Sequence, residues 1–287
     1  MNDRIGDVEL LKTAECPYEP GVLLGAGGMA RVYLGTHRSS GRQAAVKIPI
    51  GSPWAHDRFR REVDAMDRFD HIHVMPLLEA DPARRWYAMP WAMHSLRGLH
   101  LANPAAWPAL RKALSSVAGA LMHTHAHSCI HRDVTPDNIL QLRNGHWVLA
   151  DFGIAMIPGA ERRGTRRNER FGADGFTAPE LPSEATPATD AYLIGAVASW
   201  FTSIRSGQNP SSPAGRAWLE LIEGTLRHDP ASRWSIPTIA AHLEQMDSER
   251  AKVLVGALLP DSCLRCGAHG GTDAAERCLR CGFICEE

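Results

Sequence analysis

The feature that most limits how this chain can fold is a series of short motifs that occur in a particular order along it. The central motif is HRDVTPDN at residues 131–138, and Asp-Phe-Gly follows at 151–153. A glycine-rich turn at 25–32 and Ala-Val-Lys at 45–47 come earlier, and Ala-Pro-Glu comes later, at 178–180. Each motif by itself is short enough to occur by chance, but the ordered set is not. The set therefore indicates one functional domain that spans most of the chain.

The composition is that of a globular protein. Apolar residues make up 44% and charged residues 22% of the 287 residues, which allows one main domain with a packed core and one small accessory module. The formal net charge of −1 provides no overall field that would attract nucleic acid or an anionic membrane surface. We therefore expect neither of these partners.

Hydropathy along the chain argues against membrane insertion and export. Segment 1–15 mixes acidic, basic and apolar residues, so it lacks the apolar stretch of a signal peptide. No later segment approaches the ~20 consecutive apolar residues that a membrane-spanning helix needs. We expect a cytoplasmic protein.

The first third of the sequence has mainly β character. Residues 22–48 are short β-prone runs broken by glycines and polar turn residues, which predicts an antiparallel meander. Apolar residues then recur every three or four positions within 57–70, which predicts a helix. Apolar runs at 74–78 and 86–89 return to strand character. This part is expected to form a β-rich lobe with one helix.

The remainder of the sequence is mainly helical. Leu110, Leu114, Val117 and Leu121 form one apolar stripe, and residues 191–204 are apolar on nearly all sides, as in a helix at the centre of a domain. The pattern predicts an α+β fold with two lobes and a cleft between them. The expected divisions are an N-terminal segment at 1–20, a main domain at 21–246 with lobes at about 21–90 and 93–246, a linker at 247–260 and a cysteine-rich module at 261–287.

The glycine-rich turn at 25–32 and the Ala-Val-Lys motif at 45–47 suggest a phosphate site. The turn lies between two β-prone runs rather than between a strand and a helix, which argues against a dinucleotide-binding fingerprint. Glycines there would let backbone N–H groups approach phosphates, although a flexible hairpin would have the same sequence.

Lys47 is one of four lysines in an arginine-rich chain, and a solvated strand lysine is the alternative to a functional one. Glu62, beside the apolar face of the predicted helix, could reach Lys47, although a helix-surface glutamate is more often solvated.

Taken together, these motifs resemble those of the eukaryotic-type protein kinase family over about residues 22–246. The wording of the glycine-rich turn and of Met89-Pro90-Trp91 resembles the bacterial branch of that family. The resemblance implies a bilobed kinase fold and transfer of the γ-phosphoryl group of ATP to Ser/Thr hydroxyls of protein substrates, with Mg²⁺ as cofactor.

The resemblance also assigns residues to roles. Asp133 would accept or orient the substrate hydroxyl, Asp151 and Asn138 would hold Mg²⁺, and Lys47, fixed by Glu62, would contact the α- and β-phosphates. The residues that it places around the nucleotide are Gly25, Ala26, Gly27, Gly28, Val32, Ala45, Lys47, Met89, Pro90, Ala92, Asn138 and Asp151.

Further family features are architectural. Met66, His131 and Phe152 would stack as a hydrophobic spine that Asp190 anchors. Glu180 and Arg233 would form a buried ion pair in the larger lobe.

The sequence departs from the family pattern at three kinds of position. Ala30 replaces the third glycine of the turn, and the interval 205–217 is shorter than usual. Thr135 stands where Ser/Thr kinases carry a catalytic-loop lysine, and Ala173 stands where a threonine usually contacts that lysine. The loss of the lysine puts the substrate class and the rate in question. An arginine of the segment between Asp-Phe-Gly and Ala-Pro-Glu is a candidate to compensate.

The tail contains a duplicated Cys-x-x-Cys-Gly motif. Cys263 and Cys266 belong to the first copy, and Cys278 and Cys281 belong to the second. Four thiolates in two such turns favour one tetrahedral, structural Zn²⁺, and disulfide or redox use is the alternative. Zinc-ribbon-like modules of this kind commonly serve as docking sites, and the partner is not indicated.

Two other functions compete with that of an active kinase. A pseudokinase scaffold would bind nucleotide and recruit partners through the zinc module, and Thr135 and Ala173 motivate this hypothesis. A small-molecule phosphotransferase would not normally carry both Asp-Phe-Gly and Ala-Pro-Glu. Incubation with labelled ATP, Mg²⁺ and a generic protein substrate would discriminate among the three.

Overall fold

The computed structural model describes residue 11 and residues 16–99, 106–156, 175–181, 184–204 and 213–256. Backbone contacts divide the chain into two units, residues 1–240 and 241–287. The first unit contains both sheets and helices α2 to α5.

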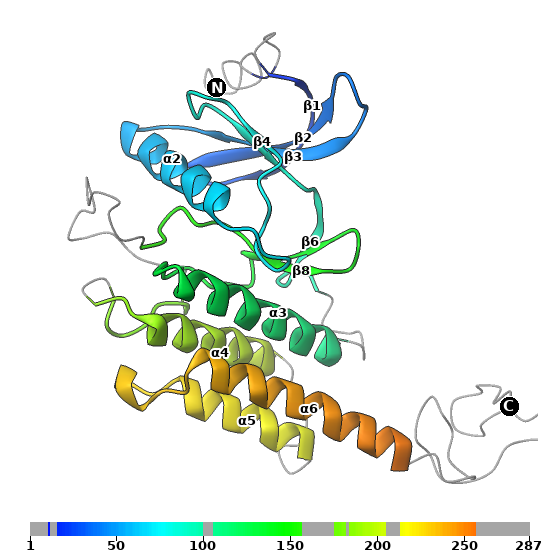
Figure 1. Cartoon of the computed structure of the whole chain (residues 1–287), viewed down its shortest axis with the longest axis vertical. Coiled ribbons are helices and arrows are strands. Elements are labelled where there is room, and N and C mark those ends of the chain that lie inside the picture. The colour runs from blue at the N-terminus through cyan, green and yellow to red at the C-terminus, as the bar shows by residue number, and fades with distance from the viewer. Residues whose placement is uncertain are drawn as a thin grey trace, which may run out of the picture. The chain divides into compact units, whose positions relative to one another are not determined.

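The first unit begins with an antiparallel sheet of five strands (Figure 1). Its strands follow the order β1-β2-β3-β5-β4, and each neighbouring pair is antiparallel. The strands are β1 (Tyr18–Ala26), β2 (Ala30–His37), β3 (Gln43–Pro49), β4 (Glu79–Ala80) and β5 (Tyr87–Met89). The expected meander is therefore present in β1 to β3.

The sheet starts earlier than the predicted boundary at residue 21. Strand β1 begins at Tyr18, and Leu11 and Cys16 are fully buried in the same apolar cluster as Tyr18 and Trp86. Arg38 holds this N-terminal stretch by donating to the carbonyl oxygens of Leu11 and Cys16 at 3.3 and 3.4 Å. The prolines at 17 and 20 concealed the strand in the sequence, because proline is tolerated on an edge strand but lowers its apparent β character.

Close packing within the sheet requires glycine at position 35. A Cβ atom at Gly35 would lie 2.6 Å from Val46 Cγ2 and 3.1 Å from Tyr18 Cβ. Strands β1, β2 and β3 therefore meet at a point where no side chain fits.

Helix α2 (Pro53–Arg68) follows strand β3. It begins earlier than the predicted range 57–70 because Ser52 precedes it in extended conformation and Pro53 presets the first turn. It ends at Arg68, because Phe69 has extended backbone angles. Its buried face includes Phe59, Glu62, Val63 and Met66.

The run at 74–78 does not form the predicted strand. Val74 makes an isolated parallel bridge with Leu149, and strand β4 starts only at Glu79. Pro76 explains the difference, because it has no N–H to donate to a neighbouring strand.

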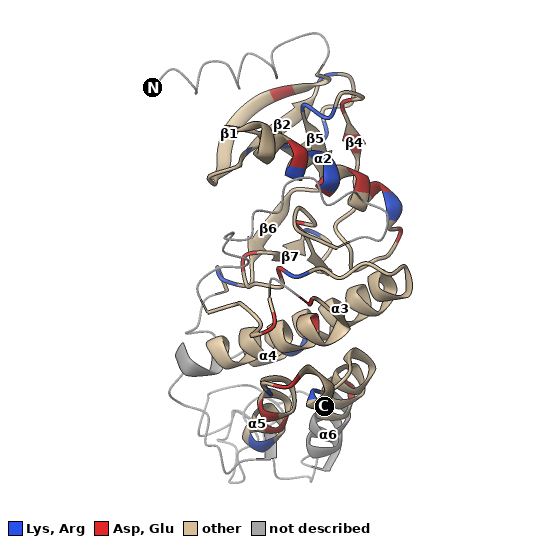
Figure 2. Cartoon of the chain, turned by 90° about the vertical axis from the view of Figure 1, so that its left-hand side faces the viewer, with Lys and Arg blue, Asp and Glu red and all other residues tan. Residues whose placement is uncertain are grey.

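A three-stranded antiparallel sheet connects the 131–138 motif to the 151–153 motif. Its strands β6 (Ala92–Ser95), β7 (Ile139–Leu142) and β8 (Trp147–Leu149) follow the order β6-β7-β8. This sheet lies between the five-stranded sheet and helix α3 in both views (Figures 1 and 2). The 131–138 motif precedes β7 and the 151–153 motif follows β8, so adjacent antiparallel strands bring the two motifs together.

The helical region consists of α3 (Ala106–Ala126), α4 (Pro187–Ile204), α5 (Pro213–Thr225), the short η1 (Pro230–Ser232) and α6 (Ile236–Gly256). Helix α4 packs against α3 and α5, and its side chains Leu193, Ile194, Val197 and Ala198 are fully buried. Figure 2 shows charge of both signs on α2, whereas α3 and α4 are mostly uncharged. The prediction of a central apolar helix at 191–204 agrees with α4.

Helix α6 crosses into the second unit and continues to Gly256. It therefore extends into the segment 247–260 that was predicted as a linker, because no further glycine or proline occurs between Pro237 in its first turn and Gly256. The rest of that segment and all four motif cysteines lie outside the described residues. Within the part of the chain that is described, no helix is both long and apolar enough to cross a bilayer.

Candidate active site

The glycine-rich turn closes the β1–β2 hairpin. Gly25 pairs with Val32 across the two strands, and the Gly27 N–H donates to the Ala30 carbonyl at 3.0 Å. A Cβ atom at Gly25 or Gly28 would meet no protein atom within 4 Å. Packing within the protein therefore does not require glycine at these two positions, which is consistent with a turn whose backbone a ligand can approach.

Lys47 on strand β3 is joined to Glu62 on helix α2. Its Nζ donates to both carboxylate oxygens of Glu62, at 2.6 and 2.8 Å, and lies 3.7 Å from Asp151 Oδ2. The Lys47 and Glu62 side chains are 13% and 4% exposed. Burial opposes the charged ammonium, but the carboxylates of Asp151 and Glu62 outweigh it and raise the pKa of Lys47. The lysine therefore stays cationic in a largely dry site.

Tyr87 completes this cluster, and the sequence analysis did not identify it. Its hydroxyl donates to Glu62 Oε1 at 2.7 Å, and the residue lies directly across from Lys47 in the β3–β5 pairing. Cross-strand register is set by tertiary structure, so the available signal was limited to the position of Tyr87 in a β-prone run.

Asp133 lies in the loop before strand β7, where Asn138 orients it. Asn138 Nδ2 donates to the Asp133 carbonyl at 2.9 Å and to Asp133 Oδ2 at 3.1 Å. Burial and the nearby negative charge of Asp151 raise the pKa of Asp133 to about 6, although Arg58, Asn138 and Lys47 act in the opposite direction. This carboxylate is therefore a stronger proton acceptor than an exposed aspartate.

Asp190, in the first turn of helix α4, holds the backbone of the same loop. Its two carboxylate oxygens accept the N–H groups of His131 and Arg132 at 2.9 and 2.8 Å, and Oδ2 lies 2.7 Å from His125 Nε2. Arg132 has φ +68° and Asp151 has φ +62°. Left-handed backbone at a non-glycine residue costs roughly 1–3 kcal/mol and persists only where the surroundings impose it. At Arg132, the fully buried Asp190 provides that constraint.

The Asp-Phe-Gly loop is packed on the same region. Phe152 is 1% exposed, and its ring lies 4.6 Å from that of His131 and 5.6 Å from that of Phe69. His131 and Phe152 thus meet as the spine prediction requires, and Met66 is buried on helix α2. Phe69, which was expected to belong to that helix, joins the cluster from just beyond its end.

Oxygen atoms at this loop suit a hard cation. Asp151 Oδ1 accepts the Gly153 N–H at 3.1 Å, and its carboxylate retains further acceptor capacity. The amide nitrogen of Asn138 faces Asp133, which leaves the Asn138 amide oxygen as an acceptor. Carboxylate and amide oxygens are ligands that Mg²⁺ accepts, so these two residues fit the predicted ion.

Arg58 is a second cation at this site that the sequence analysis missed. Its Nη2 lies 3.9 Å from both Asp133 Oδ2 and Asp151 Oδ1. The available signal was its spacing, because Arg58 precedes Glu62 by one helical turn and so shares its face.

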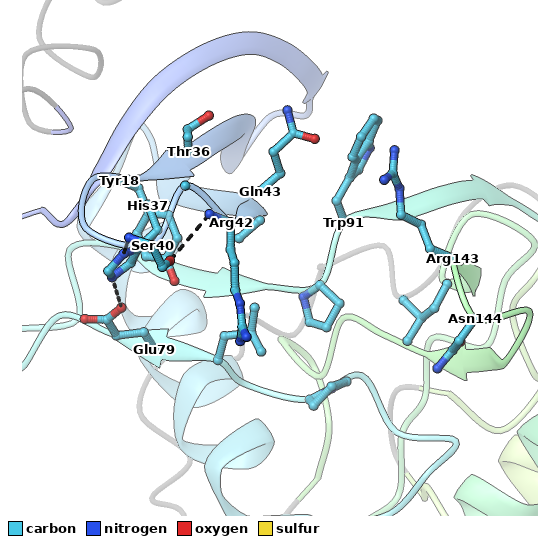
Figure 3. A pocket seen from close by; sticks show the side chains of 16 residues that line it. Tyr18, Thr36, His37, Ser40, Arg42, Gln43, Glu79, Trp91, Arg143 and Asn144 are labelled. Carbon is cyan, nitrogen blue, oxygen red and sulfur yellow. Dashed lines mark hydrogen bonds and ion pairs between the residues drawn. The ribbon is translucent and has the colours of Figure 1, made fainter.

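The connection from β5 to β6 contains the predicted nucleotide-base contacts. Met89 pairs with Ala45 on strand β3, while Pro90 and Ala92 are partly buried. Arg143 stacks on Trp91 with its guanidinium carbon 4.6 Å from the ring centre. A hollow of about 970 Å³ adjoins this connection and is lined by residues that include Thr36, Gln43 and Asn144 (Figure 3). Lys47, Asp133 and Asp151 do not line this hollow, so it is distinct from the catalytic cluster.

Glu180 and Arg233 form the expected ion pair of the helical region. Arg233 donates to both carboxylate oxygens of Glu180 at 2.7 and 2.8 Å, and Thr189 Oγ1 donates at 2.7 Å. Burial would raise the pKa of Glu180, but these hydrogen bonds outweigh it and hold that pKa below its usual value. The pair ties the Ala-Pro-Glu motif to the segment after helix α5.

Thr135 is buried and takes part in the loop itself. It is 3% exposed, and its Oγ1 accepts the Asn138 N–H at 3.3 Å. Ala173, the arginines at 162–170 and the tail cysteines lie outside the described residues.

An antiparallel sheet followed by a helical region, with a lysine–glutamate pair facing two loop aspartates, is the arrangement of a protein kinase domain. The family model described as "Protein kinase domain" matches residues 18–213. The chain belongs to the protein kinase family.

Curated relatives agree with this assignment. The chain is 32% identical over 235 residues to serine/threonine-protein kinase Pkn1 of Myxococcus xanthus, which covers 78% of this chain and 33% of Pkn1. It is 30% identical over 223 residues to serine/threonine-protein kinase AfsK of Streptomyces coelicolor, covering 72% of this chain and 27% of AfsK. It is 37% identical over 187 residues to PknK of Mycobacterium tuberculosis, covering 60% and 16%. The chain thus spans a third or less of each of these relatives.

Proposed function

We propose that this chain is a protein kinase that transfers the γ-phosphoryl group of ATP to Ser/Thr hydroxyls of protein substrates. The observation that carries the proposal is the buried Lys47–Glu62 pair, which places a cation 3.7 Å from Asp151. A purely structural ion pair would not need to face the loop carboxylates. The printed names of Pkn1, AfsK and PknK, all serine/threonine-protein kinases, support the substrate class.

The residues divide the reaction between them. Asp133 accepts or orients the proton of the substrate hydroxyl, and its pKa of about 6 suits a general base near neutral pH. Lys47 neutralises phosphate charge, and Glu62 with Tyr87 fixes the direction of its side chain. Such positioning and charge neutralisation account for most of the catalysis in phosphoryl transfer.

Asp151 and Asn138 would hold Mg²⁺, which neutralises phosphate charge when bound. The backbone of the turn at Gly25, Ala26, Gly27 and Gly28 would cover the phosphates, with Val32 and Ala45 beside the nucleotide. Met89 would act as the gatekeeper, and Pro90 and Ala92 would border the adenine. Pro90 has no N–H, so any backbone donor to the base comes from a neighbouring residue.

The enzyme is atypical at Thr135. A threonine has no positive charge that could stabilise the transferred phosphoryl group, so the contact that the family's catalytic-loop lysine makes is missing. This observation favours the second candidate function, a nucleotide-binding pseudokinase scaffold. The two functions differ in one property, because a scaffold binds nucleotide without transferring phosphate.

The tail is proposed to be a separate zinc-ribbon-like module. Cys263, Cys266, Cys278 and Cys281 would hold one structural Zn²⁺, and the motif spacing supports this. Such a module would serve as a docking site for a protein partner.

A transfer assay tests the proposed function. Purified protein is incubated with ATP labelled on its γ-phosphate, Mg²⁺ and a generic protein substrate, beside an Asp133→Asn variant. We expect label on the substrate from the wild-type protein and a loss of about 10²- to 10⁴-fold in the variant. Equal labelling by both proteins would reject the assigned role of Asp133.

A further inference from the structure

Helix α2 presents two charged side chains to the active site. Glu62 reaches Lys47, and Arg58, one turn earlier on the same face, reaches the two catalytic carboxylates. The Arg58 side chain is 17% exposed. Other basic residues of the helix differ from it: Arg60 is exposed and pairs with Asp57 on the helix surface at 3.0 Å. The inward position of Arg58 is therefore specific to its place on the helix.

The guanidinium of Arg58 contacts three functional loops. Its Nη2 lies 3.9 Å from Asp133 in the catalytic loop and 3.9 Å from Asp151. Its Nη1 lies 3.7 Å from Met29 Sδ in the glycine-rich turn. A Cβ atom at Gly153 would lie 2.7 Å from Arg58 Nε, so the side chain rests on the backbone of the Asp-Phe-Gly loop. It occupies the region between the proposed base and the proposed metal ligand.

The charge balance of this region requires a cation. Asp133 and Asp151 are both acidic, and a bound nucleotide would add its phosphate charges. The catalytic loop contributes Thr135, whose buried hydroxyl is engaged with the Asn138 N–H. Lys47 already pairs with Glu62 at hydrogen-bonding distance. Arg58 contacts the two aspartates at 3.9 Å, which is an ion pair but too long for a hydrogen bond, so its N–H groups are not committed to either carboxylate.

We propose that Arg58, on helix α2, supplies the positive charge that stabilises the transferred phosphoryl group. The catalytic loop lacks this charge because it carries Thr135. This inference rests on the proposed kinase function. In the reaction, the substrate hydroxyl oxygen forms a bond to the γ-phosphorus while the bond from that phosphorus to the β–γ bridging oxygen breaks. The electron pair of the broken bond leaves with ADP, and the hydroxyl proton passes to Asp133.

Arg58 takes no part in the proton transfer and acts through its charge and its N–H donors. Its planar fork of donors matches phosphate oxygens. It acts by stabilising negative charge on the oxygens of the transferred group as that group passes from the leaving oxygen of ADP to the attacking oxygen of the substrate.

Kinetics of matched variants test this role. Arg58→Met keeps an unbranched, mostly aliphatic side chain and removes its charge, and Arg60→Met on the exposed side of the same helix is the control. We expect Arg58→Met to lower kcat by about a hundredfold, the usual effect of removing one charge-stabilising donor, with KM for ATP nearly unchanged. Arg60→Met should retain wild-type kinetics. A kcat for Arg58→Met equal to that of the control would overturn the inference.

Restoring the charge from the catalytic loop gives a second test. Thr135→Lys should raise kcat at least tenfold more in the Arg58→Met background than in the wild-type background, because the two cations would do the same work and their effects would not be additive. Equal effects in both backgrounds would show that the two positions act independently and would contradict the proposal. That result would also direct attention to the arginines at 162–170.

A binding measurement separates this inference from the proposed function. ADP with aluminium fluoride and Mg²⁺ mimics the transferred phosphoryl group without requiring turnover. We expect Arg58→Met to weaken binding of ADP–aluminium fluoride at least tenfold relative to binding of Mg-ADP, because the contact is made to the transferred group. If Arg58→Met weakens the binding of both ligands equally, the proposed role of Arg58 is wrong. If the wild-type protein transfers no phosphate but Arg58→Met still weakens ADP–aluminium fluoride binding selectively, the proposed function fails and the inference about Arg58 stands. Wild-type protein that binds neither ligand contradicts both.

Discussion

Lys47 shows how one side chain connects strand β3, helix α2 and the Asp-Phe-Gly loop. Replacing it by methionine should abolish phosphoryl transfer and should also leave Glu62 buried without its cation, which costs about 3–5 kcal/mol when one partner of a buried pair is removed. We expect the second change Glu62→Gln to recover a large part of that stability without recovering activity. Urea denaturation and transfer assays on the two variants would separate the effects. Recovery of activity in the double variant would contradict the role of Lys47.

The Glu180–Arg233 pair makes a prediction about pH. The pKa of Glu180 is lower in the folded protein than in the unfolded chain, so its contribution to stability is present above the unfolded pKa of about 4.3 and is lost as pH falls through the folded pKa. Compared with Glu180→Gln, the wild type should be more stable at pH 7, and the difference should shrink below about pH 4.3. Free energies of unfolding at several pH values provide the measurement. A difference that stays constant down to acid pH would show that the charge of Glu180 is not involved.

The motif residues of the site were predictable from sequence, but two of its members were not. Lys47, Glu62, Asp133, Asn138 and Asp151 belong to short patterns or to a recognisable helix face, and the structure brings them together. Tyr87 and Arg58 depend on strand register and on how helix α2 is rotated toward the loops. Packing fixes both quantities, and no local pattern records them.

Helices α4 and α5 approach each other at Gly195. A Cβ atom there would overlap Thr225, whose hydroxyl is buried and donates to the Leu221 carbonyl at 2.6 Å. We expect Gly195→Ala to destabilise the protein by about 1–3 kcal/mol through overpacking. Gly119→Ala on helix α3 is the control, because its Cβ would lie 3.4 Å from His73 Cδ2, and alanine is the better helix former there by roughly 0.5–1 kcal/mol. The thermal unfolding temperature should fall for Gly195→Ala and rise for Gly119→Ala. A stabilised Gly195→Ala protein would contradict the close approach of helices α4 and α5 at this position.

Boundaries of elements were harder to predict than their existence. Helix α2 was expected from its apolar period, but Pro53 and the extended Phe69 fix its ends. Pro76 prevents a strand at 74–78, whereas Pro20 is accommodated in the edge strand β1. Proline thus prevents a strand at one position and is accepted in a strand at another. The outcome depends on whether the strand needs an N–H donor at that position to pair with its neighbour.

For the chain as a whole, the tail is proposed to be a separate metal-binding module. Protein purified without chelators should contain about one Zn²⁺ per chain, because two Cys-x-x-Cys turns complete one tetrahedral site. Cys266→Ser should lose the metal, whereas Cys285→Ser, at a cysteine that lies outside both Cys-x-x-Cys-Gly copies, should keep it. Elemental analysis of the three proteins would test this. Full zinc content in Cys266→Ser, or none in the wild type, would reject the four-cysteine site.

The β-prone runs of the first third and the apolar helical periods of the remainder predicted an antiparallel sheet followed by helices, and the fold has this arrangement. The early start of the domain was not predicted. Leu11 and Cys16 lie in a segment that mixes apolar and charged residues, and only the folded sheet shows that they complete its core. Long-range burial of this kind has no local sequence signal.

The central claim is that this site transfers phosphate to Ser/Thr hydroxyls and does not merely bind nucleotide. The most direct measurement is mass spectrometry of a peptide library containing serine, threonine and tyrosine after incubation with Mg-ATP, using wild type and Asp133→Asn proteins of equal measured affinity for Mg-ATP. We expect phosphoserine and phosphothreonine from the wild type and almost none from Asp133→Asn. Nucleotide binding by both proteins with no phosphopeptide from either would contradict the claim and identify the chain as a pseudokinase.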